Sequence, residues 1–567
     1  MSQTARFHQA LVLCTALAFV LASGACTSMD ADEGSWNDQG TTNSPTVPAN
    51  SGAAGSSGTS NAGPFVGADA GAPLGSGGFS GTGGMPGTGG GAVAAVLPTN
   101  PFVNVAHDPF STFATDVDTA SYDIFRRDVN LGRLPQASQV RLEEFVNSFA
   151  YEYAAPAPTS EVPFAIGIKA AVSPFASGTT LVRVNVQGKS AAAVEKKPAN
   201  IVYLIDVSGS MASDDKLPLV KQVARASLDV LSPTDKVSIV TYSGSTELKL
   251  SAVPASEKTR IRAVIDGLRA AGSTAGGSGI TLAYEAAAAG FIPGGINHVI
   301  MCTDGDFNVG ISSTDALVRL IEEKRKTGIT LTALGFGSDN LNDLMMERVS
   351  NAGNGVYAVI SNEGQAATYV RDSLLSTIVH IAKDVKIQVE FNPARVVAYR
   401  LLGYENRAIA DTNFRNDAID AGEIGAGHRV TALYEVVLVG GVVPMPVGAP
   451  AVQTGAPVAG ARETLATDLA MVKVRYKLPG ATESDAAREV NGHLSGDEVV
   501  QTLAAADADT QWAAAVAAFA EVLKGSPFAN RGNLGTIAAV VEAQKSRDEG
   551  RGEFAVLFAK AVKLLGQ

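Results

Sequence analysis

Three oxygen-bearing side chains follow one apolar run near the middle of the chain. Asp206, Ser208 and Ser210 stand at alternate positions, directly after the apolar run 201–205. An unbroken apolar run of this length is typical of a strand that is buried on both of its faces. Carboxylate and hydroxyl oxygens are hard ligands that suit Mg²⁺ or Mn²⁺ better than a softer metal. The triplet therefore predicts part of a divalent cation site at the end of a core strand.

Two further segments carry oxygen donors in comparable positions. Asp304 follows a second apolar run, 299–302, and Thr274 lies in the glycine-rich loop 272–279. Ligands of open α/β sheets gather at the carboxyl ends of the strands, and a glycine-rich loop lets a hydroxyl approach closely. We therefore expect one shared site. Its candidate ligands are Asp206, Ser208, Ser210, Thr274 and Asp304.

Each candidate ligand also has a simpler interpretation. Ser208, Ser210 and Thr274 could cap helices, and Asp304 could form an ordinary Asx-turn, because these residue types are common in caps and turns. The ordered combination of all five at predicted strand ends favours the cation site over four unrelated caps and turns.

Strands and helices alternate around these residues. Apolar residues recur at three- and four-residue spacing after Lys216, which predicts a helix over 217–231. Such alternation predicts a doubly wound α/β fold, in which a mostly parallel sheet is flanked by helices. The other predicted elements are strands 237–242 and 329–336 and helices 257–269, 280–289, 316–326, 340–350 and 366–377.

The order and spacing of these residues resemble the metal-ion-dependent adhesion site of von Willebrand factor type A domains. The resemblance implies that Asp206, Ser208, Ser210, Thr274 and Asp304 are the metal ligands. It also implies that the hydroxyls bind directly, that the carboxylates act partly through water, and that one coordination position accepts an acidic group from a partner. The expected function is therefore the binding of a protein that supplies Asp or Glu to the metal.

The composition disfavours several other classes of function. The net charge of −12 is opposite in sign to the basic charge that is typical of nucleic-acid-binding proteins. The six histidines are scattered without metal-ligand spacing, and no P-loop lysine follows the glycine-rich loop. We therefore expect a binding protein and not an enzyme. The alternative is a metal-dependent hydrolase acting on phosphoesters, in which the same ion polarises a phosphate or activates water.

The N-terminus predicts export. The apolar segment Ala10–Leu21 follows Arg6 and is too short to span a bilayer, as in a secretory signal. The following residues, 21–26, resemble the lipobox of bacterial lipoproteins, which implies a lipid on Cys26 and a membrane anchor in the cell envelope. Thr27, in place of aspartate, favours the outer membrane by the same resemblance. Ordinary cleavage after Ala25 remains open, because Ser23 stands where leucine is usual.

The segments outside the α/β domain are less informative. Stretches 113–122, 141–149 and 420–428 resemble YfbK-like bacterial type A domain lipoproteins. The spacing of Asp116 and Asp118 also occurs in haloacid-dehalogenase phosphatases, but an N-cap at Asp118 or Thr119 for a helix toward residue 129 is the favoured interpretation. In the last part of the chain we expect strands 386–391, 396–404, 430–439 and 471–478, then helices near 496–523 and 534–565.

These observations divide the chain into five expected segments. Residues 26–98 are dominated by small residues and proline, so they cannot bury enough apolar surface to offset the entropy of ordering. The expected segments are a signal peptide (1–25), a disordered tether (26–98), an N-terminal α+β region (99–190), the type A domain (191–382), and a C-terminal region of strands followed by helices (383–567).

Overall fold

The computed structural model describes residues 98–566. It leaves out 116–117, 195, 274–276, 306–313, 339–340, 418–420, 456–461 and 482–484. The predicted signal peptide, Cys26 and the predicted tether up to residue 97 therefore lie outside the described residues, as does Thr274.

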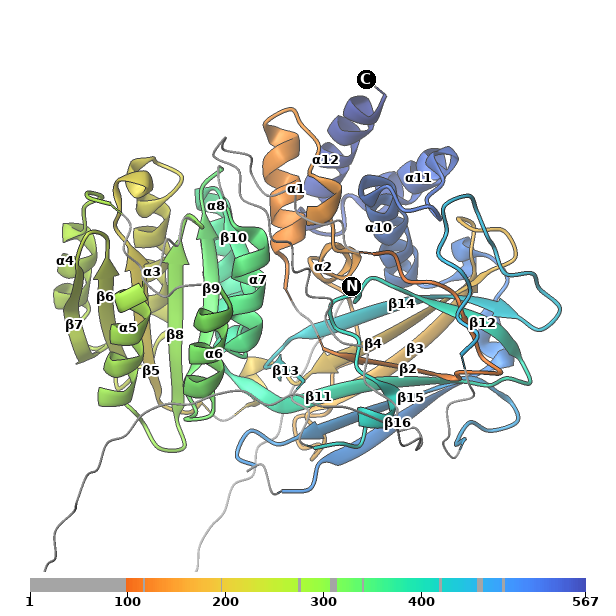
Figure 1. The fold of residues 1–567 in the computed structure, drawn as a ribbon, viewed down its shortest axis with the longest axis horizontal. Helices are drawn as coiled ribbons and strands as arrows, with labels where there is room; N and C mark the ends of the chain where they lie inside the picture. The colour runs from red at the N-terminus through yellow and green to blue at the C-terminus, as the bar shows by residue number, and fades with distance from the viewer. Residues whose placement is uncertain are drawn as a thin grey trace, which may run out of the picture. The chain divides into compact units, whose positions relative to one another are not determined.

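The middle of the chain forms a doubly wound α/β domain, which confirms the predicted fold class (Figure 1). Its strand order is β10-β9-β8-β5-β6-β7, and every neighbouring pair is parallel except β6 with β7. The strands are β5 (Ala199–Asp206), β6 (Lys236–Tyr242), β7 (Thr246–Pro254), β8 (Ile296–Thr303), β9 (Thr330–Phe336) and β10 (Tyr357–Ile360). The helices are α3 (Leu217–Val230), α4 (Lys258–Gly267), α5 (Gly277–Ala289), α6 (Thr314–Arg325), α7 (Asp343–Ala352), α8 (Glu363–Thr368) and α9 (Leu374–Ile378).

Both faces of this sheet are buried. Ile201, Tyr203 and Ile205 pack into one core with α3, α4, α8 and α9, while Val202 and Leu204 pack into a second core with α5, α6 and α7. Because successive strand residues point to opposite faces, a strand between two helical layers needs apolar residues at every position. This requirement explains the unbroken apolar runs 201–205 and 299–302, which precede Asp206 and Asp304.

The chain segments before and after the α/β domain form two sheets together. One sheet has the order β1-β12-β14-β4-β3-β17, and the other has the order β13-β11-β15-β16, with β2 also pairing with β11. The strands from the N-terminal side are β1 (Val103–Asn104), β2 (Phe110–Ala114), β3 (Phe164–Val172) and β4 (Thr180–Gly188). Those from the C-terminal side are β11 (His380–Phe391), β12 (Val396–Leu402), β13 (Gly422–Gly425), β14 (Arg429–Leu438), β15 (Asp468–Lys477), β16 (Arg488–Ser495) and β17 (Val499–Val500). Residues of β4, β11, β14 and β15 share one core, so the two sheets pack against each other.

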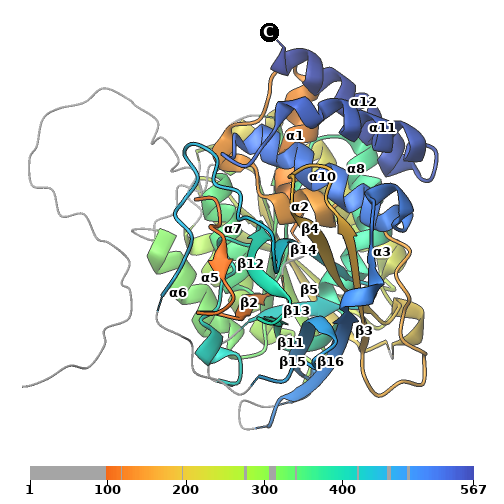
Figure 2. The ribbon, with the colours of Figure 1, turned by 90° about the vertical axis from the view of Figure 1, so that its right-hand side faces the viewer.

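Helices from the two ends of the chain also lie together. Figures 1 and 2 show α1 (Ala120–Asn130) beside α12 (Glu549–Leu565), and these helices share an aromatic core with α2 (Leu142–Asn147) and α10 (Ala508–Lys524). Trp512 and Phe554 are fully buried there, with ring centroids 5.4 Å apart. Helix α11 (Leu534–Gln544) packs on α10. Among the described helices, none combines the length and apolar character needed to cross a membrane.

Residues 118–123 cover the edge strand β10 of the α/β domain. Asp118 Oδ1 accepts a hydrogen bond of 2.7 Å from the Tyr357 amide, and Asp123 Oδ2 accepts one of 3.4 Å from the Val359 amide. Helix α1 begins directly after Thr119, close to the predicted position, but Thr119 makes no side-chain cap bond. Asp118 is therefore a structural acceptor for an edge strand that would otherwise present unpaired amides.

Candidate metal centre

The fold brings the ends of two neighbouring parallel strands together. Strand β5 ends at Asp206, and β8 ends one residue before Asp304, with Ile205 paired with Cys302 in the register between them. The carboxyl ends of parallel neighbours lie at one edge of a sheet, so both carboxylates emerge at the same place. Asp206 is fully buried and Asp304 is 2% exposed.

The turn after β5 presents its hydroxyls beside these carboxylates. The Ser208 amide donates a hydrogen bond of 2.8 Å to Asp206 Oδ1, and the hydroxyls of Ser208 and Ser210 are 2.9 Å apart. Ser208 precedes the short helical turn 209–212 without making a side-chain cap bond, so the simpler capping interpretation does not account for its hydroxyl. Ser210 is exposed and lies at the surface of the turn.

The glycine-rich loop is attached to the same turn. The Gly209 amide donates to the Gly272 carbonyl oxygen at 2.9 Å, and the Ala271 amide donates to the Val207 carbonyl oxygen at 2.8 Å. A side chain at Gly209 would approach the Gly272 carbonyl oxygen to 3.3 Å, so the two segments pass closely. The loop that leads to Thr274 therefore begins at the predicted edge of the sheet.

Burial and a neighbouring charge raise the pKa of Asp206. Burial raises the pKa of Asp206 to about 6. The hydrogen bonds from Ser208 act in the opposite direction and lower this pKa, whereas the negative charge of Asp304 raises it further. The Lys216 ammonium lies 2.9 Å from Asp304 Oδ2. Two carboxylates against one ammonium leave one negative charge in excess, and a buried excess negative charge favours a cation.

The structure thus brings four of the five predicted ligands to one edge. These four are Asp206, Ser208, Ser210 and Asp304. Two carboxylates and two hydroxyls are the hard donors that fit a small divalent cation, so the residues present suit the predicted metal. Their role as ligands stays a prediction, as does that of Thr274. Lys216 was not foreseen, because nothing in the sequence shows that its side chain reaches the end of β8.

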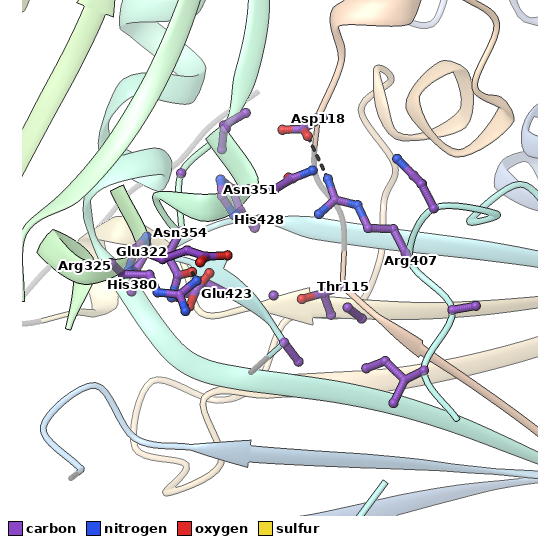
Figure 3. A pocket seen from close by; sticks show the side chains of 18 of the residues that line it. Thr115, Asp118, Glu322, Arg325, Asn351, Asn354, His380, Arg407, Glu423 and His428 are labelled. Carbon is purple, nitrogen blue, oxygen red and sulfur yellow. Dashed lines mark hydrogen bonds and ion pairs between the residues drawn. The ribbon is translucent and has the colours of Figure 1, made fainter. Parts of the chain in front are cut away.

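A polar pocket lies near the opposite ends of the strands, at the amino ends of β9 and β10 (Figure 3). Its volume is about 480 Å³. It is lined by Arg325 at the end of α6, by Asn354 before β10, and by residues of the segments before and after the α/β domain. Burial lowers the pKa of His380 to about 4 and that of His428 to about 3, so both rings are neutral at pH 7. The pocket lies at the amino ends of β9 and β10 and is separate from the predicted metal ligands.

Three buried carboxylates form another cluster next to this pocket. Oxygen atoms of Asp118, Glu144 and Glu347 lie within 4.8 Å of one another. Arg407 pairs with Asp118 at 2.9 Å and with Glu347 at 3.3 Å, and Arg141 pairs with Glu144. The two guanidinium groups pair with all three carboxylates and join the α/β domain to the rest of the chain, so the described contacts form a salt-bridge network.

Family models and known proteins match most of this chain. The models match the von Willebrand factor type A domain over residues 200–372, von Willebrand factor over 95–183, and the C-terminal region of Uncharacterized protein YfbK over 376–564. The chain is 37% identical over 455 residues to Uncharacterized protein YfbK of Escherichia coli (strain K12), which covers 79% of this chain and 77% of that protein.

More distant similarities involve the α/β domain or the fold. The chain is 27% identical over 183 residues to human Inter-alpha-trypsin inhibitor heavy chain H4, covering 31% of this chain and 20% of that protein. The solved structure of a von Willebrand factor type A protein from Catenulispora acidiphila is 15% identical, with a TM-score of 0.38, over 73% of this chain and 88% of that one. The extent of the YfbK match decides the family: the chain belongs to the YfbK family of proteins with a von Willebrand factor type A domain.

Proposed function

We propose that this chain is a binding protein of the bacterial cell envelope that uses a metal-ion-dependent adhesion site to bind an acidic group of a protein partner. The metal is Mg²⁺ or Mn²⁺, and its ligands are Asp206, Ser208, Ser210, Thr274 and Asp304. One observation carries the proposal. Two buried carboxylates leave adjacent strand ends beside the paired hydroxyls of Ser208 and Ser210.

The charges of the site favour an anionic ligand. Asp206 and Asp304 contribute two negative charges and Lys216 one positive charge. A divalent cation would bring the sum to one positive charge, which a carboxylate from a partner would neutralise. Type A domains commonly bind proteins through such a site, and the family match over residues 200–372 supports the same use here.

The proposal includes anchoring through a lipid on Cys26, with the outer membrane as the favoured location. The lipobox-like residues 21–26 and the long small-residue segment after them support an anchor that holds the folded part at a distance from the membrane. Mass spectrometry of the chain recovered from membranes tests this part, because a lipidated Cys26 adds acyl mass that simple cleavage after Ala25 does not.

The metal test uses the purified full chain and isothermal titration with MgCl₂ and MnCl₂. We expect the wild type to bind one equivalent of metal and Asp206→Ala to bind none, with unchanged circular dichroism. Asp229→Ala is the matched control, since Asp229 is 61% exposed and lies near the far end of α3. Equal metal binding by the wild type and Asp206→Ala would refute the site.

The partner test uses the same variants in envelope extracts. Proteins retained by the wild type in Mg²⁺ should be released by chelator and should not be retained by Asp206→Ala. Retention that survives both chelator and the substitution would exclude metal-dependent capture.

The alternative, a metal-dependent phosphoester hydrolase, has less support. A hydrolase needs a general base near the metal. None of the histidines that the structure describes belongs to the turns 206–210 or 303–305. If the wild type hydrolyses p-nitrophenyl phosphate in the presence of a divalent cation and Asp206→Ala does not, the hydrolase becomes the better supported of the two functions.

A further inference from the structure

The side chain of Lys216 forms an ion pair with Asp304, one of the predicted metal ligands. Lys216 Nζ is 2.9 Å from Asp304 Oδ2, and the side chains are only 12% and 3% exposed. An ion pair withdrawn from water in this way is screened less by solvent and salt than a surface pair. The ammonium therefore neutralises a carboxylate that the proposed site needs for its cation.

The surrounding backbone holds this lysine in place. Lys216 lies directly before α3, and its amide donates to the Ser213 carbonyl oxygen at 3.1 Å. Its aliphatic stem packs on Gly337, where an added Cβ would lie 2.6 Å from Lys216 Cε. Gly337 has a φ of +94°, a conformation that favours glycine. The next residue, Ser338, donates to Asp215 Oδ2 at 3.0 Å, so the loop after β9 encloses the segment that carries Lys216.

We propose that Lys216 sets the divalent-cation affinity of this site, because its ammonium and the cation compete for Asp304. The inference rests on the proposed function and adds a determinant of affinity within the chain itself. Binding of the cation displaces the ammonium from Asp304, and repulsion between the two positive charges weakens the cation's binding. The site therefore binds the divalent cation only at concentrations high enough for that cation to displace the Lys216 ammonium from Asp304.

A competing role and a purely structural role of Lys216 predict opposite changes in metal affinity when its charge is removed. Lys216→Met keeps the length and apolar stem of the side chain but removes its charge. If Lys216 competes with the cation, the substitution should strengthen Mg²⁺ and Mn²⁺ binding by about tenfold or more, since one repelling charge near the ion is lost. If Lys216 only supported the turn, its removal would weaken metal binding.

The affinity experiment is isothermal titration of the full chain with MgCl₂ and with MnCl₂. Lys216→Met and Lys216→Gln should both bind more tightly than the wild type, while Lys216→Arg should stay close to it because the charge is kept. Lys258→Met is the charge-matched control, since Lys258 pairs with Asp229 near the far end of α3. Unchanged or weaker binding in both uncharged variants would overturn the proposal, even if the wild type binds metal normally.

Displacement is measured separately by lysine labelling with acetic anhydride and mass spectrometry. Lys216 should be labelled slowly in chelator and several-fold faster in saturating MgCl₂, while Lys258 should not respond. A Lys216 labelling rate that saturating metal leaves unchanged would also overturn the proposal. Absence of metal binding in the wild type and in every Lys216 variant would instead refute the proposed function, and with it this inference.

Discussion

The histidine inside β8 makes stability depend on pH in a way that can be calculated. His298 is fully buried, and its Nδ1 lies 2.6 Å from Thr330 Oγ1, while Nε2 has no hydrogen-bond partner among the described residues. Burial lowers its pKa from 6.5 to about 3, and the neighbouring His380 adds to the shift. The folded chain therefore keeps this ring neutral where the unfolded chain protonates it.

The sign and size of the effect follow from linkage. Since the folded pKa lies below the unfolded one, the unfolded state binds the extra proton, so the stability from neutral His298 is present above pH 6.5 and is lost as the pH falls. Between pH 7 and pH 5 the loss is about 2 kcal/mol, because the slope approaches about 1.4 kcal/mol per pH unit below pH 6.5. Buried carboxyl groups with raised pKa values, such as Asp123 at about 6, change stability in the opposite direction. The wild-type profile alone therefore does not isolate the histidine.

Substitution of His298 isolates the contribution of this histidine to the pH dependence of stability. His298→Asn removes the titrating group, so the difference in unfolding free energy between the wild type and this variant should shrink by about 2 kcal/mol from pH 7 to pH 5. Urea denaturation of the full chain, followed by circular dichroism in the presence of chelator, measures that difference at each pH. His428→Asn should behave similarly, because burial lowers the pKa of His428 to about 3 as well. A difference that is constant between pH 7 and pH 5 would show that His298 is not held neutral by the fold.

Two further predictions concern the metal and the helical core. MgCl₂ at about a hundred times its dissociation constant should stabilise the wild type by about 2.7 kcal/mol and leave Asp206→Ala unchanged, as measured by thermal denaturation with and without chelator. An equal rise in both proteins would point to metal binding elsewhere. Trp512→Ala should cost about 3–5 kcal/mol, because Trp512 is fully buried against Phe149 and Phe554. A loss below about 1 kcal/mol in urea denaturation would show that this core is not tightly packed.

The sequence predicted the α/β domain well because its pattern is local. The apolar run 201–205 is unbroken, since helices cover both faces of β5, and this pattern predicted both the strand and the parallel sheet. The helix predicted over 217–231 is α3, at residues 217–230. The positions of Asp206 and Asp304 followed directly, because each lies at the end of such a run.

Helix boundaries near the C-terminus were predicted less well. The helix expected over 534–565 is divided into α11 and α12, because the Asp548 side chain accepts a hydrogen bond from the Arg551 amide and starts a new helix. The helix expected near 496–523 begins only after Asp507, whose side chain caps α10 through the Thr510 amide. A cap competes with continuation of a helix, and composition alone did not reveal it.

Long-range pairing could not be predicted from patterns of this kind. Residues 181–186 form part of β4, but nothing in their pattern specifies that β4 pairs with β14, about 250 residues later. The interleaving of the two flanking regions into shared sheets is decided by tertiary packing. The Lys216 to Asp304 pair is of the same kind, since 88 residues separate its members.

The way the α/β domain is attached suits the proposed function. Joining contacts come from edge strand β10, through Asp118, from helix α7, where Glu347 pairs with Arg407, and from the loop before β10, where Asn354 donates to Glu423. The predicted metal ligands instead follow β5 and β8, in the middle of the sheet, and Ser210 is exposed there. A domain held along one edge by buried ion pairs can present the carboxyl ends of its central strands to a partner. Binding at the proposed metal would then leave the attachment of the α/β domain undisturbed.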